Sequence, residues 1–304
     1  GGSNEATQCD NLKLTVTLRE PDPIPLPPQN LQAPLVGAGF VQLTWDSPEG
    51  DQKVGYQVEK DGVLLPATTA TEYWDYEVVP EAEYTYRVQA INNGGEPNAE
   101  GPIPEDGLTV TTVALQPSVG WLMGKIYDEV GGVNVADGLA DPNYPDNPSR
   151  IVFINGLTFG EPNFGGTYGD NYFIEIQGTL TLDQSGEYDF FCRSDDACQF
   201  YLNLDGASIP EVDEINYLVR EDGCCNAFLE PDDATMVEQT TWIPESVSAG
   251  TEMGFTFVVK EGGGGDWGQI AWRIEGDTTA AADLPPIQGS VLKGMVDPTG
   301  TTIE

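Results

Sequence analysis

The chain has 304 residues, with 12 lysines and arginines against 50 aspartates and glutamates, no histidine, and a formal net charge of -38. This balance argues against nucleic acid and anionic lipid as partners, because both need a basic protein surface. The lack of histidine excludes Ser-His-Asp and Cys-His nucleophiles and histidine-bound zinc.

The acidic residues must coat a folded body, because 39% hydrophobic and 10% aromatic residues are too many for a disordered tail. Such a surface repels itself, and added salt screens the repulsion. We therefore expect the melting temperature to rise along a NaCl series followed by circular dichroism. A flat or falling melting temperature would contradict a salt-adapted acidic surface.

The cysteine content indicates the cellular compartment, and the glycine and proline contents indicate the kind of fold. Five cysteines, two of them adjacent, suit an oxidising compartment. The 36 glycines and 23 prolines indicate many turns between short strands. No stretch reaches the length of a membrane span, and no signal peptide is visible at Gly1. We expect an extracellular or cell-surface protein, without membrane insertion, that is either mature or an excised segment.

Residues 1–20 hold a single predicted strand, in which apolar and polar residues alternate over 12–18. Residues 21–29 follow as a proline-rich linker. A lone strand before a stiff linker cannot fold by itself. It is either the last strand of an upstream module or a strand lent to another subunit, and the unpaired Cys9 fits intermolecular linkage or a partner outside this sequence.

Residues 30–115 alternate between strands and turns, without helical periodicity. Trp45, Tyr56 and the segment YTYRVQAIN from Tyr84 resemble the fibronectin type III family over the whole of this region. The resemblance implies an immunoglobulin-like β-sandwich that acts as a spacer. It also implies that Tyr84 forms a tyrosine corner, in which its hydroxyl bonds to upstream backbone.

Residues 119–288 also show strand alternation. Alternating apolar residues mark four of the expected strands: Tyr172, Ile174 and Ile176; Tyr188, Phe190 and Cys192; Phe255, Phe257 and Val259; Ile270, Trp272 and Ile274. About 170 residues of this kind predict one β-sandwich or distorted barrel, so the fold class is all-β. Residues 289–304 have no module of their own and are predicted to be a C-terminal tail or linker.

Asp195 and Asp196 lie at the tip of a predicted hairpin in this second region. Adjacent carboxylates repel each other unless something holds them together, and Ca²⁺ is the usual extracellular cation with oxygen ligands. The alternative is a solvated turn, since aspartate often bonds its own backbone there.

Several phrases of the second region occur in a recognisable order: GWLMGKIY from 120, PNYPDNP from 142, YGDNY from 168, SGEYDF from 185, SDD from 194, FYL from 200 and KEGGGGDW from 260. This order is similar to the PA14 family and covers essentially all of 119–288. The family includes bacterial adhesins, glycosidases, yeast flocculins and toxin subunits. The resemblance implies a β-sandwich in which an Asp-Asp pair joined by a cis peptide holds Ca²⁺, and the ion in turn chelates sugar hydroxyls. That pair maps onto Asp195 and Asp196.

The glycine run before Trp267 supplies further candidate site residues. Asp266 is a candidate third carboxylate, or else a turn-capping aspartate. Gly264 and Gly265 can bring backbone carbonyls close to an ion, or form a flexible hairpin loop. Trp267 offers a flat face for a pyranose ring, unless it packs at a strand end.

Four cysteines of the second region permit three disulfide pairings. Cys192 and Cys198 flank the Asp-Asp turn and are candidates for a bridge across the hairpin. A bridge from the hairpin to Cys224 or Cys225 is equally allowed. A zinc site is not expected, because the cysteine spacings do not repeat.

Together these features predict an extracellular adhesion or binding protein whose PA14-like domain binds Ca²⁺ and a carbohydrate. Catalysis is not expected, because Asp195 and Asp196 are adjacent and cannot flank a glycosidic bond at the about 5–10 Å that hydrolysis requires. The alternative is a structural subunit of an extracellular fibre or sheath. In that case residues 12–18 complete a neighbour's sheet, and calcium is purely structural.

Overall fold

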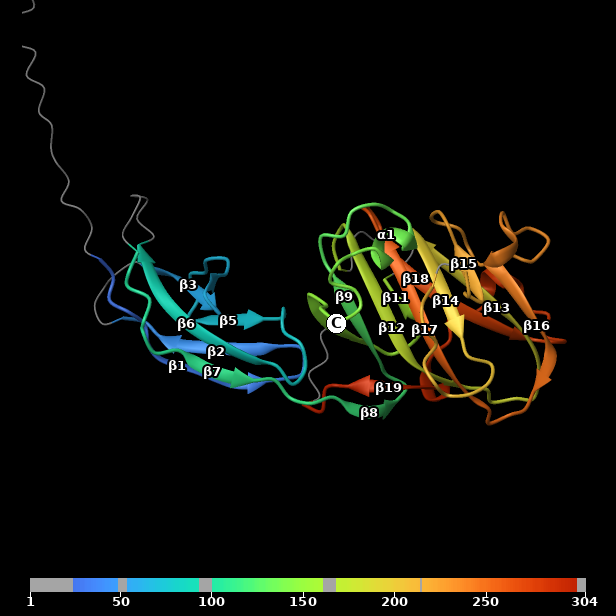
Figure 1. Ribbon diagram of the computed structural model, residues 1–304, viewed down its shortest axis with the longest axis horizontal. Helices are drawn as coiled ribbons and strands as arrows, with labels where there is room; N and C mark the ends of the chain where they lie inside the picture. The colour runs from blue at the N-terminus through green and yellow to red at the C-terminus, as the bar shows by residue number, and fades with distance from the viewer. Residues whose placement is uncertain (1–23, 49–53, 93–99, 161–167, 214, 300–304) are drawn as a thin grey trace, which may run out of the picture.

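A computed structural model describes residues 24–48, 54–92, 100–160, 168–213 and 215–299, and shows two β-rich halves side by side along the long axis (Figure 1). The predicted all-β fold class is confirmed. The predicted strand at 12–18 and Cys9 lie outside the described residues, so strand exchange stays a prediction. Within the described ranges, no helix is long and apolar enough to cross a membrane.

The first half is a sandwich of two sheets. One sheet has the order β1-β2-β5 and the other β4-β3-β6-β7. The bounds are β1 Gln29–Val36, β2 Val41–Asp46, β3 Val54–Lys60, β4 Val63–Leu64, β5 Glu72–Asp75, β6 Glu83–Asn92 and β7 Leu108–Thr111. Trp45 and Tyr56 meet in its core, with ring centroids 5.4 Å apart. The Tyr84 hydroxyl accepts the Val79 N–H at 3.0 Å, as predicted for a tyrosine corner. Membership of the fibronectin type III family stays a resemblance.

The second half packs a larger sheet against a smaller one. The larger sheet contains β8 Gln116–Val119, β9 Leu122–Tyr127, β10 Arg150–Ile154, β12 Tyr172–Thr181, β14 Ala197–Leu202, β15 Val219–Glu221, β17 Glu252–Glu261 and β19 Leu292–Val296. The smaller sheet contains β11 Thr158–Phe159, β13 Gly186–Asp195, β16 Thr240–Val247 and β18 Trp267–Ile274. Short helices lie in the connections: α1 Val135–Leu139, η1 Val237–Gln239, η2 Ala281–Asp283 and η3 Gly289–Val291.

Both faces of the larger sheet are covered, which explains why β17 is buried along nearly its whole length. One face packs on the smaller sheet through an aromatic core that includes Phe190, Phe200 and Phe255. The other face lies under loops and α1, where Phe173 and Tyr201 are buried. A strand covered on both sides reads as a continuous apolar run rather than an alternation.

The two halves are joined by their own small core. Ala38 of the first half packs in a buried cluster with Ile151 and Phe153 of the second. The buried N–H of Ala38 donates to the Asp297 carboxylate at 2.6 Å.

Beside this joint, β19 pairs with β8 and β12 (Figure 1). The prediction that 289–304 form a tail was therefore wrong for 289–296. Leu292 of β19 is fully buried, but a strand of five residues with three apolar side chains gives little periodicity to detect.

Candidate metal centre

The chain crosses from one sheet to the other at the Asp-Asp pair. Asp195 is the last residue of β13 in the smaller sheet and pairs with Trp267 of β18. The Asp196 N–H donates to the Lys260 carbonyl of β17 at 3.2 Å, and β14 then continues in the larger sheet. The peptide bond between the two aspartates is cis, as the family resemblance implied. Both carboxylates are thereby placed where the two sheets meet.

A third carboxylate, that of Glu261 at the end of β17, joins this pair. One carboxylate oxygen from each of Asp195, Asp196 and Glu261 lies within 4.8 Å of the others, and we call these three residues the acidic corner. Glu261 is fully buried, and neither of its carboxylate oxygens has a hydrogen-bond partner among the described residues. A buried carboxylate without partners is strongly unfavourable. The donor set therefore fits a cation that prefers several carboxylate oxygens, such as Ca²⁺.

The titration behaviour of the acidic corner reflects the same crowding. Burial, and then the charges of Asp196, Asp195 and Asp266, raise the pKa of Glu261 to about 8, although Lys260 opposes this. Burial and the charges of Asp196 and Asp266 likewise raise the pKa of Asp195. The ionised carboxylates repel one another at this short separation, and a bound divalent cation would offset that repulsion.

We expect the stability of the calcium-free protein to fall as the pH rises toward 8. Folding raises the pKa of Glu261 from 4.5 to about 8, so the native state holds its proton more tightly than the unfolded chain across that window. The contribution of Glu261 to the free energy of unfolding is therefore complete below pH 4.5. It is lost as the pH rises to about 8, where Glu261 ionises in the native state. Melting in EDTA from about pH 6 to about pH 8.5 measures the effect. Glu261→Gln should flatten the dependence, and an equally steep decline in that variant would contradict the assignment.

Asp266 does not provide the third carboxylate as predicted. It is fully buried, its Oδ2 accepts the Tyr168 N–H at 2.6 Å, and it is absent from the set of acids whose oxygens lie together. Its charge still acts nearby, because it raises the pKa values of Asp195 and Glu261. The capping alternative describes Asp266 better, and the third carboxylate is Glu261.

The glycine run lies against the acidic corner, as predicted. Its N–H groups donate to nearby aspartates, while the Gly262 carbonyl accepts the Asn171 N–H at 3.2 Å. Gly262 donates to the Asp196 Oδ2 at 2.9 Å, and Gly264 donates to the Asp170 Oδ1 at 3.2 Å. A Cβ on Gly262 would lie 2.8 Å from Val133 and 3.1 Å from Asp196, so a larger residue there would displace these side chains. Coordination by the carbonyls of Gly264 and Gly265 stays a prediction.

Trp267 does not present a face to a ligand, and this prediction was wrong. Its side chain is 3% exposed because β18 begins at this residue and pairs with Asp195. The Arg193 guanidinium lies 5.5 Å from its ring centroid. The packing alternative describes Trp267.

The cysteines pair differently from the hairpin bridge that we considered first. Cys224 and Cys225 form a disulfide with each other. Cys192 and Cys198 are free, buried thiols, and burial raises the pKa of Cys192 well above its usual range. The hairpin bridge and the bridges from the hairpin to the Cys224-Cys225 pair are therefore not present.

Residues 222–235, which we call the disulfide loop, are fixed beside the acidic corner. Buried Glu221 holds the near end: its Oε2 accepts the Ser194 N–H at 2.7 Å, and its Oε1 accepts the Asn226 side-chain amide at 2.7 Å. Burial raises the pKa of Glu221 to about 7. The Cys225 N–H also donates to the Ser194 carbonyl at 2.9 Å. The loop is therefore attached directly to the residue that precedes the Asp-Asp pair.

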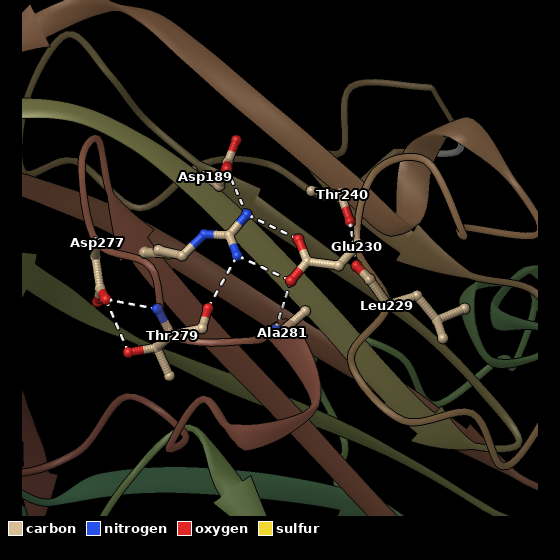
Figure 2. Close-up of polar contacts among 8 residues, drawn as sticks. Asp189, Leu229, Glu230, Thr240, Asp277, Thr279 and Ala281 are labelled. Atoms are coloured by element: carbon tan, nitrogen blue, oxygen red, sulfur yellow. Dashed lines mark hydrogen bonds and ion pairs between the residues drawn. The ribbon is translucent and has the colours of Figure 1, made fainter.

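Figure 2 shows the second attachment of the disulfide loop, at Glu230. Arg273 of β18 donates to both carboxylate oxygens of Glu230, at 3.1 and 3.0 Å, and the Ala281 N–H donates to the same carboxylate at 2.8 Å. Between the two attachments, Phe228 is 1% exposed and packs against Phe191. Polar and apolar anchors together fix the loop against β13 and β18 of the smaller sheet.

Glu261 and Glu221 are the two residues of this centre that sequence reasoning did not select. Glu261 stood inside a quoted motif, immediately before the glycine run, and its signal was an acidic residue at the end of a strand rich in apolar residues. Glu221 was missed because Ser194 becomes its neighbour only in the folded protein, although its other partner, Asn226, is five residues away.

No protein-family model matches the sequence. Among solved structures, the chain is similar to the PA14 domain of the MpAFP antifreeze protein, with a TM-score of 0.42 and 14% identity, over 63% of this chain and 96% of that one. It is also similar to the Epithelial Adhesin 9 A domain of Candida glabrata in complex with Galβ1-4GlcNAc, with a TM-score of 0.41 and 11% identity, over 60% of this chain and 93% of that one.

Among curated proteins, the chain is similar to short segments of much longer relatives. It is 35% identical to an alpha-amylase of Niallia circulans over 72 residues, which are 23% of this chain and 6% of the amylase. It is 30% identical to usherin of Mus musculus over 74 residues, which are 23% of this chain and 1% of usherin. The chain thus spans a small part of each of these proteins.

Proposed function

We propose that the second half of the chain binds Ca²⁺ at the acidic corner and, through the bound ion, a carbohydrate, in an extracellular adhesion or binding protein. The observation that carries the proposal is Glu261, a fully buried carboxylate whose two oxygens lack partners and which faces two further carboxylates. Nearby Lys260 donates to the Glu261 backbone carbonyl and not to the carboxylate. A cation is therefore the partner that this carboxylate still needs.

Asp195, Asp196 and Glu261 would hold the ion, and the Gly262 N–H fixes the Asp196 carboxylate from behind. Asp195 and Asp196 are only partly buried, whereas Glu261 is fully buried. The corner therefore has an inner wall of protein and an outer side open to solvent. Ca²⁺ accepts 6–8 oxygen ligands, so bound calcium would supply coordination positions for hydroxyl groups on that outer side.

Calorimetric titration of Ca²⁺ into the wild type and into Asp195→Asn tests the metal step. We expect one site in the wild type and loss of measurable binding in the variant. A glycan array probed with and without EDTA tests the second step, and binding that EDTA abolishes supports it. Equal calcium affinity in both proteins would move the ion away from the acidic corner. Calcium binding without any glycan signal would leave a structural calcium site.

A further inference from the structure

The exposed disulfide between Cys224 and Cys225 is the feature of this region that the calcium proposal does not use. Both cysteines are exposed. Their sulfur atoms and a carboxylate oxygen of Asp195 all lie within 4.8 Å of one another. Sulfurs bonded to each other are not thiolates, so they do not ligate a metal. The disulfide must therefore either stabilise the conformation of the loop or contact a ligand that binds from the solvent side.

We propose that the Cys224-Cys225 disulfide forms the apolar wall of a sugar subsite beside the acidic corner, packing against the C–H face of a pyranose whose hydroxyls reach the ion. This inference rests on the proposed calcium function and adds the residues that would contact the sugar ring. It also moves the ring-stacking role from buried Trp267 to a surface that solvent reaches.

Chemistry favours this role for the disulfide. Its sulfurs are polarisable and form no strong hydrogen bonds, so contact with C–H groups costs little desolvation. A pyranose combines such C–H groups on one face with hydroxyls at its rim. One sugar ring could place its hydroxyls at the ion and its C–H groups at the sulfurs, because carboxylate oxygens of Asp195 lie within 4.8 Å of both the sulfurs and the other acids of the corner.

Rigidity favours it as well. The two cysteine side chains are closed into one ring and cannot lose rotamer freedom when a ligand binds, which removes part of the usual cost of association. The loop beneath them is fixed at Ser194 through Glu221 and the Cys225 N–H, and at Arg273 through Glu230. The wall is thus held in place before any ligand arrives.

The test compares calcium and sugar binding in the full chain after the disulfide is removed in two ways. One is Cys224→Ala/Cys225→Gly, with glycine at 225 because Cys225 has a φ of 79° that glycine adopts without strain. The other is reduction of the wild type with a phosphine, with mass spectrometry to verify that the bond is open. The probes are Ca²⁺ alone and then methyl pyranosides of glucose, galactose, mannose and fucose in saturating Ca²⁺. The control Asp232→Ala/Asp233→Ala changes two exposed residues of the same loop.

We expect both treatments to leave calcium affinity within about threefold of the wild type and to weaken the best sugar about tenfold, equivalent to about 1.4 kcal/mol. The control should match the wild type in both. Unchanged sugar affinity without the disulfide would overturn the wall, and so would a calcium-loaded wild type that binds none of the sugars. A wild type that binds no calcium would instead overturn the proposed function, and the wall with it.

Discussion

Glu261→Gln is expected to lower calcium affinity about 100-fold while leaving the calcium-free protein as stable as the wild type or more so. The carboxylate supplies charge to the ion, and ligand charge largely sets calcium affinity. Without the ion, however, Glu261 is a buried acid whose pKa is raised to about 8, mainly by burial. A neutral amide of the same shape removes the like-charge repulsion within the acidic corner.

Calorimetry with Ca²⁺ and melting in EDTA and in Ca²⁺ together measure both halves of this result. Glu275→Gln is the matched control, because Glu275 is exposed and lies beyond the end of β18. A variant that loses stability equally with and without calcium would show that Glu261 is a packing residue. A variant that binds calcium as the wild type does would place the ion elsewhere.

Phe200→Ala is expected to destabilise the second half by about 3–5 kcal/mol, the usual range for removing a buried phenylalanine. Phe200 is fully buried, and its ring lies 6.0 Å from that of Phe190 and 5.7 Å from that of Phe255, centroid to centroid. It therefore joins the two sheets. Loss of its ring should also weaken calcium binding, since β14 and β17 carry Asp196 and Glu261 toward each other.

Urea unfolding followed by tryptophan fluorescence measures this change. The first half has its own core around Trp45 and Tyr56, so its transition should stay in place while the second moves. Trp242→Ala is the control, because its side chain is 41% exposed and a surface change of this kind shifts stability little. A loss below about 1 kcal/mol in Phe200→Ala would contradict the described core.

Local patterns were sufficient to predict the long strands β12, β13, β17 and β18. Tyr188, Phe190 and Cys192 alternate in sequence and are all buried on β13. The Tyr84 hydroxyl bond could be anticipated because its partner, Val79, is five residues away. Asp195 and Asp196 stood out for the same reason, since like charges that are adjacent in sequence are adjacent in space.

Features that depend on pairing between distant strands could not be predicted in this way. Glu261 reaches Asp196 because Ala197 pairs with Lys260, a contact over more than sixty residues that no local signal encodes. The sequence allows Trp267 either to face a sugar or to pack at a strand end, and the start of β18 at this residue buries it. Cys192 and Cys198 do lie together, but as free thiols in the core between the two sheets rather than as a bridge across a hairpin.

The joint between the halves has a mechanical consequence. The chain enters β8 at Gln116 and leaves β19 at Val296, and these two residues face each other across the pair. A force that pulls on the first half and on the chain after Asp297 would therefore act on the hydrogen bond between Ala38 and Asp297. The same force would separate β8 from β19 one residue pair at a time. The roughly 170 residues between β8 and β19 would not carry this force. In a molecule stretched between two attachments, the acidic corner would therefore keep its geometry until β8 and β19 separate.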